Sequence, residues 1–316
     1  MRALTIKDKE LELVERDTPE PGPHDVVVEV KAAGINAADL MQRQGFYPAP
    51  AGSPPDVPGM ELAGHVSAVG AGVPASLLGR RVCAVVGGGA QATHCVVASE
   101  HLLFVPDHVS WDEAGGFPET FTTAYDALVT QGRLESGERV LVSGATGGVG
   151  VAGVQIAHAL GANVVAVTRD STRHGELRAL GANETITLEQ VGSLEHVDVV
   201  LELLGAANLS VAQGILNPHA RVVVIGVGTG ARVEIDLLVI MRTRYTLTGS
   251  TLRSRSREEK AAVAHLVGEA LVPLWERHEI TVPIAKTFEL GDASAAYEFF
   301  AQPGKFGKVV LRVGVQ

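Results

Sequence analysis

Glycines at positions 144, 147, 148 and 150 follow an apolar run, Val140–Val142, and precede a second apolar run that is helical in pattern. A strand, a glycine turn and a helix in this order can cradle a pyrophosphate: glycine lets the backbone come close, and the helix N-terminus attracts negative charge. The spacing is G-x-x-G-G-x-G, with Thr146 where the strict G-x-G-x-x-G pattern has glycine, so a turn without a ligand is the alternative. A strand at 163–168 completes a βαβ unit and favours a dinucleotide held by Gly147, Gly148, Val149 and Gly150.

The end of the strand at 163–168 indicates which dinucleotide is bound. NAD sites usually place an acidic residue there to bond the ribose 2′-hydroxyl, whereas this chain has Thr168 followed by Arg169. A hydroxyl and a guanidinium suit a 2′-phosphate, which predicts NADPH as the cofactor. Arg173 is a further candidate for the same phosphate, and solvated surface charges are the alternative for both arginines. Asp170 lies beyond the strand, and we expect it to cap the next helix.

Length and composition predict a globular protein of two domains. The chain has 316 residues, of which 46% are hydrophobic and 20% charged. No run reaches the ~18 apolar residues of a membrane helix, and the N-terminus lacks a signal-peptide core, so we expect a cytoplasmic protein without a membrane partner. Cys83 and Cys95 are too few for a disulfide framework or a zinc knuckle. The net charge of −10 argues against a general nucleic-acid surface.

The hydrophobic pattern changes character along the chain. Up to about residue 115, short strand-like runs separated by Gly and Pro predict a β-barrel-like domain, with strands at 26–34, 61–70, 80–86 and 92–99. After a helix at 119–131, strands alternate with helices and predict a doubly wound parallel sheet, with strands at 139–143, 163–168, 197–203, 221–226 and 245–250. An amphipathic helix at 258–276 and a strand-rich tail at 281–316 follow. We therefore predict a β-barrel-like domain at 1–115 and 278–316 and a dinucleotide-binding domain at 116–277; the resemblance described below implies that the first of them binds the substrate.

Five arginines gather near the last predicted strand of the sheet, at positions 242, 244, 253, 255 and 257. Because Glu258 and Glu259 follow and the chain is acidic, we interpret this cluster as a solvated, ion-paired edge and not as a nucleic-acid site. The strand at 245–250 forms an open sheet edge unless it is paired. Pairing with its twin across a two-fold axis would close that edge, which predicts a homodimer.

Longer stretches of the chain resemble the zinc-free quinone oxidoreductases of the medium-chain dehydrogenase/reductase superfamily, especially their NADPH-dependent branch. The resemblance rests on AAGINAADLMQRQGFYPAP (32–50), VPGMELAGHVSAVGAGV (57–73), FPETFTTAYDAL (117–128), LRALGANETI (177–186), GSTLRSRSREEKAA (249–262) and FGKVVLRV (306–313). It spans essentially the whole chain and implies an α/β protein with a GroES-like β-barrel domain and a Rossmann domain.

The resemblance also implies a site without a metal. Zinc-containing relatives carry cysteine near the position of Asn36 and Gly-His-Glu where this chain has Gly-Met-Glu at 59–61. The thioether of Met60 is a poor zinc ligand, and the amide of Asn36 supplies no thiolate. Because no metal is expected, Glu61 is expected to be structural. His65 and His94 are expected to be hydrogen-bonded strand residues.

Without a Lewis acid, the hydride acceptor must need little activation. A quinone meets this condition because it delocalises the negative charge, and the predicted function is therefore reduction of a quinone by NADPH. A reductase of enones, enals or enoyl thioesters is an alternative. A non-catalytic NADPH-binding or RNA-binding protein that has kept the cofactor fold is another.

Further site residues are implied by the family's motifs. The family places a tyrosine of the 44–50 loop beside the nicotinamide and the acceptor, which implies this role for Tyr47, with a loop anchor as the alternative. Asn36 replaces a lost zinc ligand and is implied as a donor to the acceptor or nicotinamide, or else is a turn residue after Gly34. We expect the proton to come from solvent and not from Asp39. Thr123, Phe306, Gly307 and Lys308 are further contacts that the family implies near the cofactor, and Ser250, Thr251 and Leu252 are implied to line either the nicotinamide or the dimer seam. Gly226 and Val227 end a predicted strand at the carboxyl edge of the sheet, where cofactors lie.

Overall fold

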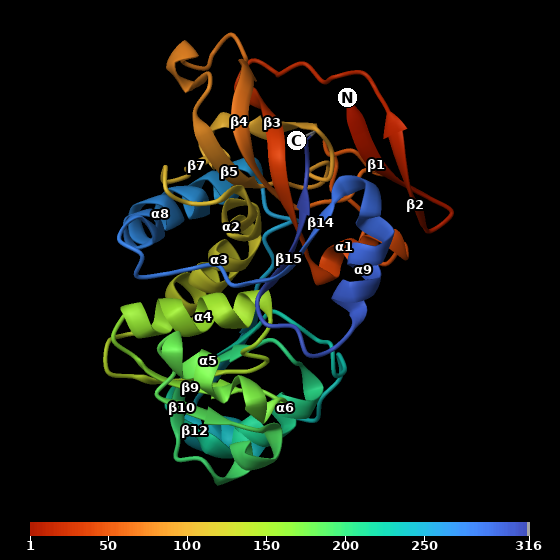
Figure 1. Cartoon of the computed structure of the whole chain (residues 1–316). Coiled ribbons are helices and arrows are strands. Elements are labelled where there is room, and N and C mark those ends of the chain that lie inside the picture. The colour runs from red at the N-terminus through yellow and green to blue at the C-terminus, as the bar shows by residue number, and fades with distance from the viewer. Residues whose placement is uncertain (315–316) are drawn as a thin grey trace. The chain divides into compact units, whose positions relative to one another are not determined.

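The computed structural model describes residues 1–314, which form two compact units (Figure 1). One unit comprises residues 1–122 and 252–314, and the other comprises residues 123–251. The second boundary differs from the prediction, because helix α8 (Arg257–Glu276) belongs to the first unit, where Trp275 stacks on Phe117 with ring centroids 4.1 Å apart. Among the described residues, no helix combines the length and the apolar composition that crossing a bilayer requires.

The first unit is built on a mostly antiparallel sheet. Its strands follow the order β14-β15-β3-β4-β5-β7, with β6 also paired to β3. The bounds are β3 (Asp25–Ile35), β4 (Glu61–Val69), β5 (Arg81–Val85), β6 (His94–Ala98), β7 (Leu103–Phe104), β14 (Ile284–Glu289) and β15 (Lys308–Arg312). A separate hairpin joins β1 (Arg2–Lys7) to β2 (Glu10–Glu15). The predicted early strands are confirmed, and so is the return of the tail, because β15 pairs with β3.

The first unit also contains helices, one of which buries polar side chains. They are α1 (Ala37–Arg43), α2 (Trp111–Gly116), α8 and α9 (Ala293–Ala301), while α3 (Pro118–Tyr125) crosses into the second unit. Helix α1 begins directly after β3 and buries two polar side chains, Asp39 and Gln42. The strand-rich tail that we predicted also contains α9, which packs Tyr297 into the core.

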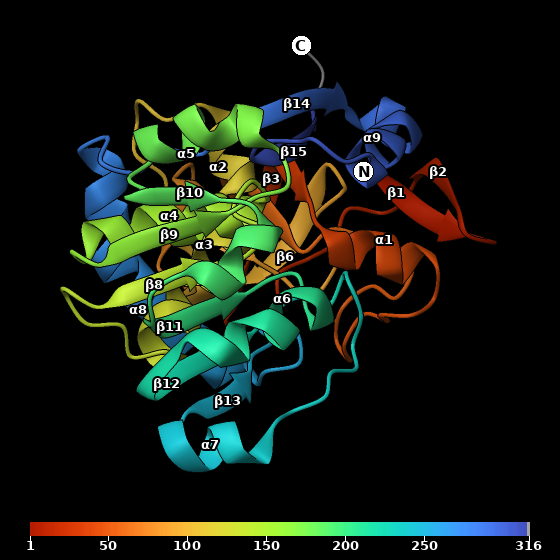
Figure 2. The same ribbon diagram turned by 90° about the horizontal axis from the view of Figure 1, so that it is seen from below.

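The second unit is a six-stranded parallel sheet, whose order β10-β9-β8-β11-β12-β13 can be followed in Figure 2. The bounds are β8 (Arg139–Val142), β9 (Asn163–Val167), β10 (Glu184–Ile186), β11 (Val197–Glu202), β12 (Leu216–Val224) and β13 (Thr246–Gly249). The connecting helices are α4 (Gly148–Ala159), α5 (His174–Ala179), α6 (Ala206–Ala212) and α7 (Leu237–Thr243). The order reverses between β8 and β11, which makes their carboxyl ends the switch point where such sheets bind ligands.

The central strands of this sheet are continuous apolar runs. Residues 140–142, 164–167 and 199–201 are almost fully shielded from solvent. Such runs are typical of parallel strands that helices cover on both faces. The predicted doubly wound sheet is confirmed, and the short strand β10 is an addition that the sequence analysis missed.

Candidate functional site

The glycine turn lies between β8 and α4, as predicted. Gly147 is the N-cap residue of α4, and no side chain caps the helix there, so its first backbone N–H groups are left for a ligand. A Cβ atom on Gly150 would lie 2.4 Å from the backbone oxygen of Gly144. The turn therefore needs glycine at 150 for its own close packing, while Gly147 stays exposed at the helix start.

The residues after β9 differ in whether they form hydrogen bonds or ion pairs within the protein. Thr168 is buried, and its hydroxyl accepts a hydrogen bond of 3.1 Å from the backbone N–H of Asp170. Asp170 accepts from Thr172 N at 3.0 Å and caps the short helix that follows, which confirms its expected role. Arg173 forms ion pairs with Glu176 at 3.0 Å and with Asp170 at 3.8 Å. Arg169 is exposed and takes part in none of the ion pairs formed by the described residues.

A buried carboxylate at the end of β11 was missed in the sequence analysis. Glu202 is fully buried and accepts hydrogen bonds from Ser143 Oγ at 2.9 Å and from the backbone N–H groups of Leu204 and Gly205, both at 2.7 Å. Asn208 Nδ2 is a further donor. This network fixes the loop beyond β11 against the end of β8, at the switch point of the sheet. A charged residue inside the apolar run 197–203 was the available signal.

The other predicted cofactor residues of this unit lie at loop positions. Gly226 packs against the residue that follows β11, because a Cβ atom there would lie 2.3 Å from the backbone oxygen of Leu203. Val227 is half exposed at the end of the same loop. Ser250 Oγ donates to Asp126 Oδ2 at 2.7 Å. Thr123 and Thr251 are accessible to solvent, and their roles stay predictions.

In the first unit, Lys308 and Glu61 form a buried ion pair. Their side chains are 4% and 0% exposed, and Lys308 Nζ donates to Glu61 Oε1 at 2.6 Å. Lys308 Nζ also donates to Asn36 Oδ1 at 2.7 Å and to the backbone oxygen of Ile35 at 3.1 Å. These bonds use all three hydrogens of the ammonium group. The predicted contact of Lys308 with the cofactor stays a prediction.

The same pair fixes the amide of Asn36. Its Oδ1 accepts from Lys308, while its Nδ2 donates to Glu61 Oε1 at 2.8 Å. Glu61 Oε2 accepts in turn from the backbone N–H of Glu119 at 2.8 Å. Glu61 thus has the structural role that the sequence analysis gave it. One hydrogen of Asn36 Nδ2 remains outside the side-chain hydrogen bonds formed by residues 1–314.

Two further carboxyl groups, those of Asp39 and Glu119, lie near the Lys308–Glu61 pair. Asp39 accepts from the backbone N–H groups of Asn36 at 2.8 Å and Gly59 at 3.2 Å, and burial raises its pKa to about 6. Burial also raises the pKa of Glu119 to about 8, and the nearby Glu61 carboxylate adds to that rise. Glu119 is therefore mostly protonated at neutral pH. Its importance was not visible in the sequence.

Arg253 corrects our interpretation of the arginine cluster. It is only 5% exposed, and its guanidinium donates to Gln42 Oε1 at 2.6 Å and to the backbone oxygens of Tyr47 and Gly87, both at 2.9 Å. Its Cζ atom lies 5.0 Å from the centroid of the Tyr47 ring, so Arg253 anchors the predicted acceptor loop. Arg257 does form the expected surface ion pairs, with Asp25 and Glu100.

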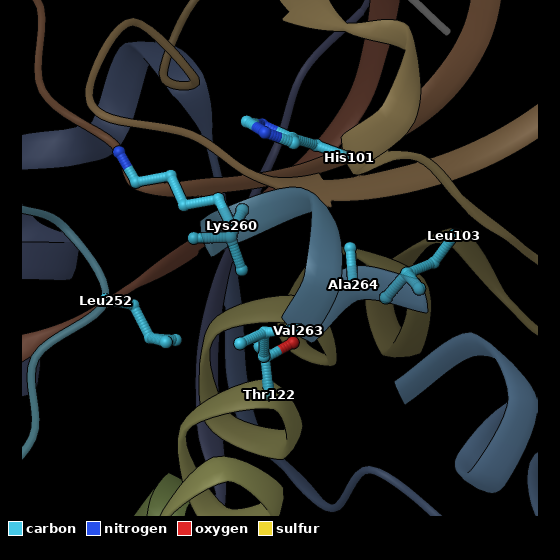
Figure 3. A pocket seen from close by; sticks show the side chains of 8 residues that line it. His101, Leu103, Thr122, Leu252, Lys260, Val263 and Ala264 are labelled. Carbon is cyan, nitrogen blue, oxygen red and sulfur yellow. The ribbon is translucent and has the colours of Figure 1, made fainter. Parts of the chain in front are cut away.

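A small pocket in this unit is lined by residues of β7 and α8 and by Leu252 (Figure 3). Its walls are mostly apolar and include Leu252, next to Arg253 in sequence, together with Val85, Leu103, Val263 and Ala264. Lys260, His101 and Thr122 supply its polar groups. Burial lowers the pKa of Lys260, and the charges of Glu119 and Arg253 act on it as well. Apolar walls with a few polar groups are typical of small-molecule sites.

His65 and His94 form hydrogen bonds, and both cysteines are buried. His65 Nδ1 lies 3.1 Å from the backbone oxygen of Gly79, and His94 Nδ1 lies 3.2 Å from Thr93 Oγ1. Burial raises the pKa of the Cys95 thiol to about 12 and that of Cys83 still further. Within residues 1–314, no group of three or more His, Cys, Asp or Glu side chains is arranged to hold a metal ion.

Comparisons with known proteins agree with this architecture. Residues 22–132 match the alcohol dehydrogenase GroES-like domain, and residues 148–268 match the zinc-binding dehydrogenase family. A quinone oxidoreductase of Lama guanicoe is 31% identical over 93% of this chain and 90% of its own length. The crystal structure of the quinone oxidoreductase from Thermus thermophilus, also solved in complex with NADPH, has a TM-score of 0.86 at 33% identity, covering 99% of this chain and all of that one. The synaptic vesicle membrane protein VAT-1 homolog of Danio rerio is 27% identical, and this chain spans 66% of its length.

The raised pKa of Glu119 predicts a pH-dependent stability. Above the unfolded pKa of about 4.5, the unfolded chain releases this proton while the folded chain keeps it, so the stability it contributes declines as the pH rises through about 8. The decline is about 1.4 kcal/mol per pH unit for one proton. We expect the variant Glu119→Gln, which has no proton to release, to gain stability relative to the wild type between about pH 5 and pH 8 in urea unfolding. The exposed Glu298→Gln is the control, and parallel profiles for Glu119→Gln and the wild type would contradict the prediction.

Proposed function

Because the chain belongs to the quinone oxidoreductase branch of the medium-chain dehydrogenase/reductase superfamily, we propose that it is a zinc-independent, NADPH-dependent quinone reductase. Oxidoreductase chemistry with a nicotinamide dinucleotide follows from the family and the fold. The choice of NADPH, the absence of zinc and the quinone acceptor are proposals. The metal-free proposal is supported above all by the Lys308–Glu61 pair, which places an ammonium group against Asn36, where zinc-containing relatives have a metal ligand.

The nucleotide-binding residues fit a phosphorylated dinucleotide. The uncapped start of α4 offers backbone N–H groups to the pyrophosphate, and Arg169 extends into solvent with its guanidinium unengaged. No carboxylate occupies the end of β9, where Thr168 stands. Arg173 is less suitable because Glu176 and Asp170 hold it. NADPH bound here would supply the hydride, and the protein would supply its orientation.

The metal-free proposal follows from the donor set. Asn36 and Met60 stand where relatives have a thiolate and an imidazole, and Glu61 is neutralised by Lys308. A zinc ion placed against Asn36 and Glu61 would meet the buried ammonium, so binding zinc would require Lys308 to leave or to lose its proton. An acceptor reduced at such a site must stabilise its own developing charge, as a quinone does. An enone is a weaker acceptor that the same groups would serve.

Asn36 and Tyr47 are the proposed contacts of the acceptor. Lys308 and Glu61 hold the amide of Asn36 in one orientation, which leaves an Nδ2 hydrogen to donate to an acceptor oxygen. Tyr47 stands on a loop that Arg253 fastens through its backbone oxygen and its ring. The reduced acceptor takes its proton from solvent in this scheme.

The Arg169→Glu variant tests the proposed cofactor preference. Loss of a charge-assisted bond to the 2′-phosphate, about 1.5–3 kcal/mol, should weaken NADPH binding about 10- to 100-fold while NADH binding changes little. The measurement is calorimetric titration with both cofactors, together with quinone-dependent NADPH oxidation. Arg178→Glu is the matched control, because it makes the same charge change at an exposed position of α5. Equal effects of the two substitutions would rule out this role for Arg169.

The partner proposed for this chain, besides its small-molecule substrate, is a second copy of itself. Strand β13 is the open edge of the parallel sheet, as expected. Helix α7, close to it in sequence, leaves Leu237, Leu238 and Met241 exposed. An open edge beside exposed apolar side chains favours pairing across a two-fold axis.

The homodimer can be tested by its mass in solution. Analytical ultracentrifugation should give twice the chain mass for the wild type. The double substitution Leu238→Glu and Met241→Glu should shift this mass towards the monomer, because it places charges in an apolar contact. A monomer mass for the wild type at every concentration would refute the dimer.

A further inference from the structure

The first unit buries two cations whose surroundings differ. The ammonium of Lys308 contacts the Glu61 carboxylate at 2.6 Å, so its charge is neutralised within the fold. The guanidinium of Arg253 is equally buried, yet its three hydrogen-bond acceptors are the side-chain amide oxygen of Gln42 and two backbone oxygens, all of them neutral. None of the ion pairs formed by residues 1–314 includes Arg253. Its positive charge is thus left without a contacting anion.

The carboxyl groups nearest to Arg253 do not remove this charge. Asp39 and Glu119 both act on the guanidinium electrostatically, but neither reaches it within ion-pair distance. Glu119 is mostly neutral at pH 7, because burial raises its pKa to about 8. Asp39 points its oxygens at the backbone N–H groups of Asn36 and Gly59. A buried cation without a partner is costly, and it is commonly retained where an anion forms during function.

The position of Arg253 places this charge beside the proposed acceptor contact. Its Cζ atom lies 5.0 Å from the centroid of the Tyr47 ring, and the preceding residue, Leu252, lines the apolar pocket of Figure 3. Arg253 is only 5% exposed, and a charge shielded from water acts over a longer distance than one in water. The charge of Arg253 therefore reaches the space next to Tyr47.

We propose that Arg253 supplies the positive charge that stabilises the oxyanion of the reduced acceptor, the task that zinc performs in metal-containing relatives. The inference rests on the proposed function. The acceptor gains a hydride from NADPH, with both electrons of the broken C–H bond, and one quinone oxygen then carries a negative charge until a proton from water neutralises it. The positive charge of Arg253 stabilises this oxygen electrostatically, while the N–H groups of Arg253 remain bonded to the Tyr47 loop. Lys308 cannot stabilise the oxygen in this way because Glu61 already cancels its charge.

The first test separates charge from architecture with a panel of acceptors. Para-quinones of decreasing reduction potential and an enone are compared by kcat/KM in the wild type, Arg253→Lys and Arg253→Gln. Loss of the charge in Arg253→Gln should reduce kcat/KM most for the weakest acceptor, about 10²-fold, and least for the strongest quinone. Arg253→Lys keeps the charge, so it should lower kcat/KM by the same factor for every acceptor. Arg277→Gln, which removes an exposed and locally paired cation, is the control. A uniform loss in Arg253→Gln would show a merely structural role and overturn the proposal.

The second test measures binding and not turnover. A measurement on the wild type is enough to refute the proposal, even without the variants. A phenol dye such as 4-nitrophenol, which mimics the oxyanion when ionised, is titrated in the NADP⁺ complex and its absorbance followed against pH. We expect the pKa of the bound dye to fall by at least about one unit, a tenfold preference for the phenolate, in the wild type and Arg253→Lys but not in Arg253→Gln. An unchanged or raised dye pKa in the wild type overturns the proposal even if Arg253→Gln does not fold. If no quinone or enone is reduced while the dye still binds as phenolate, the proposed function fails and the electrostatic role of Arg253 stands.

Discussion

The ion pair between Lys308 and Glu61 is the interaction on which the rest of the candidate site depends. Both groups are buried, and the pair is stable there because hydrogen bonds satisfy every hydrogen of the ammonium. Removing either partner would leave an isolated buried charge, so the two residues constrain each other. The pair also fixes the amide of Asn36 and, through Glu61, the start of α3. A single contact between residues 61 and 308 thus orients Asn36, the proposed donor to the acceptor.

This arrangement changes how the site can treat negative charge. In zinc-containing relatives one ion both organises the ligands and stabilises the oxyanion. In the proposed scheme the two tasks fall to different cations: Lys308, whose charge Glu61 cancels, orients Asn36, and Arg253 keeps an uncompensated charge beside Tyr47. The protonated state of Glu119 preserves that division, because an ionised carboxylate nearby would oppose Arg253. A fixed cation of this kind suits acceptors that share in stabilising their own charge.

The sequence was most informative where function depends on local structure. The glycine turn, the parallel strands and the role of Asp170 follow from short patterns, and the structure has them where expected. Arg253 was misread and Glu119 overlooked, because residues distant in sequence set their surroundings: Gln42 and Gly87 accept hydrogen bonds from Arg253, and the Glu61 carboxylate helps to raise the pKa of Glu119. Lys308 was matched by family position alone, and its partner Glu61 lies 247 residues away. Local composition holds no information on such contacts, whereas β10 was missed because it has only three residues.

The most direct test of the account is to determine zinc content and quinone-dependent NADPH oxidation in one preparation of the full-length protein, before and after dialysis against a chelator. If Lys308 holds the place of the metal, the protein contains far less than one zinc per chain, and its turnover is the same after dialysis. One zinc per chain, with activity that is lost on chelation and restored by zinc, would contradict the account.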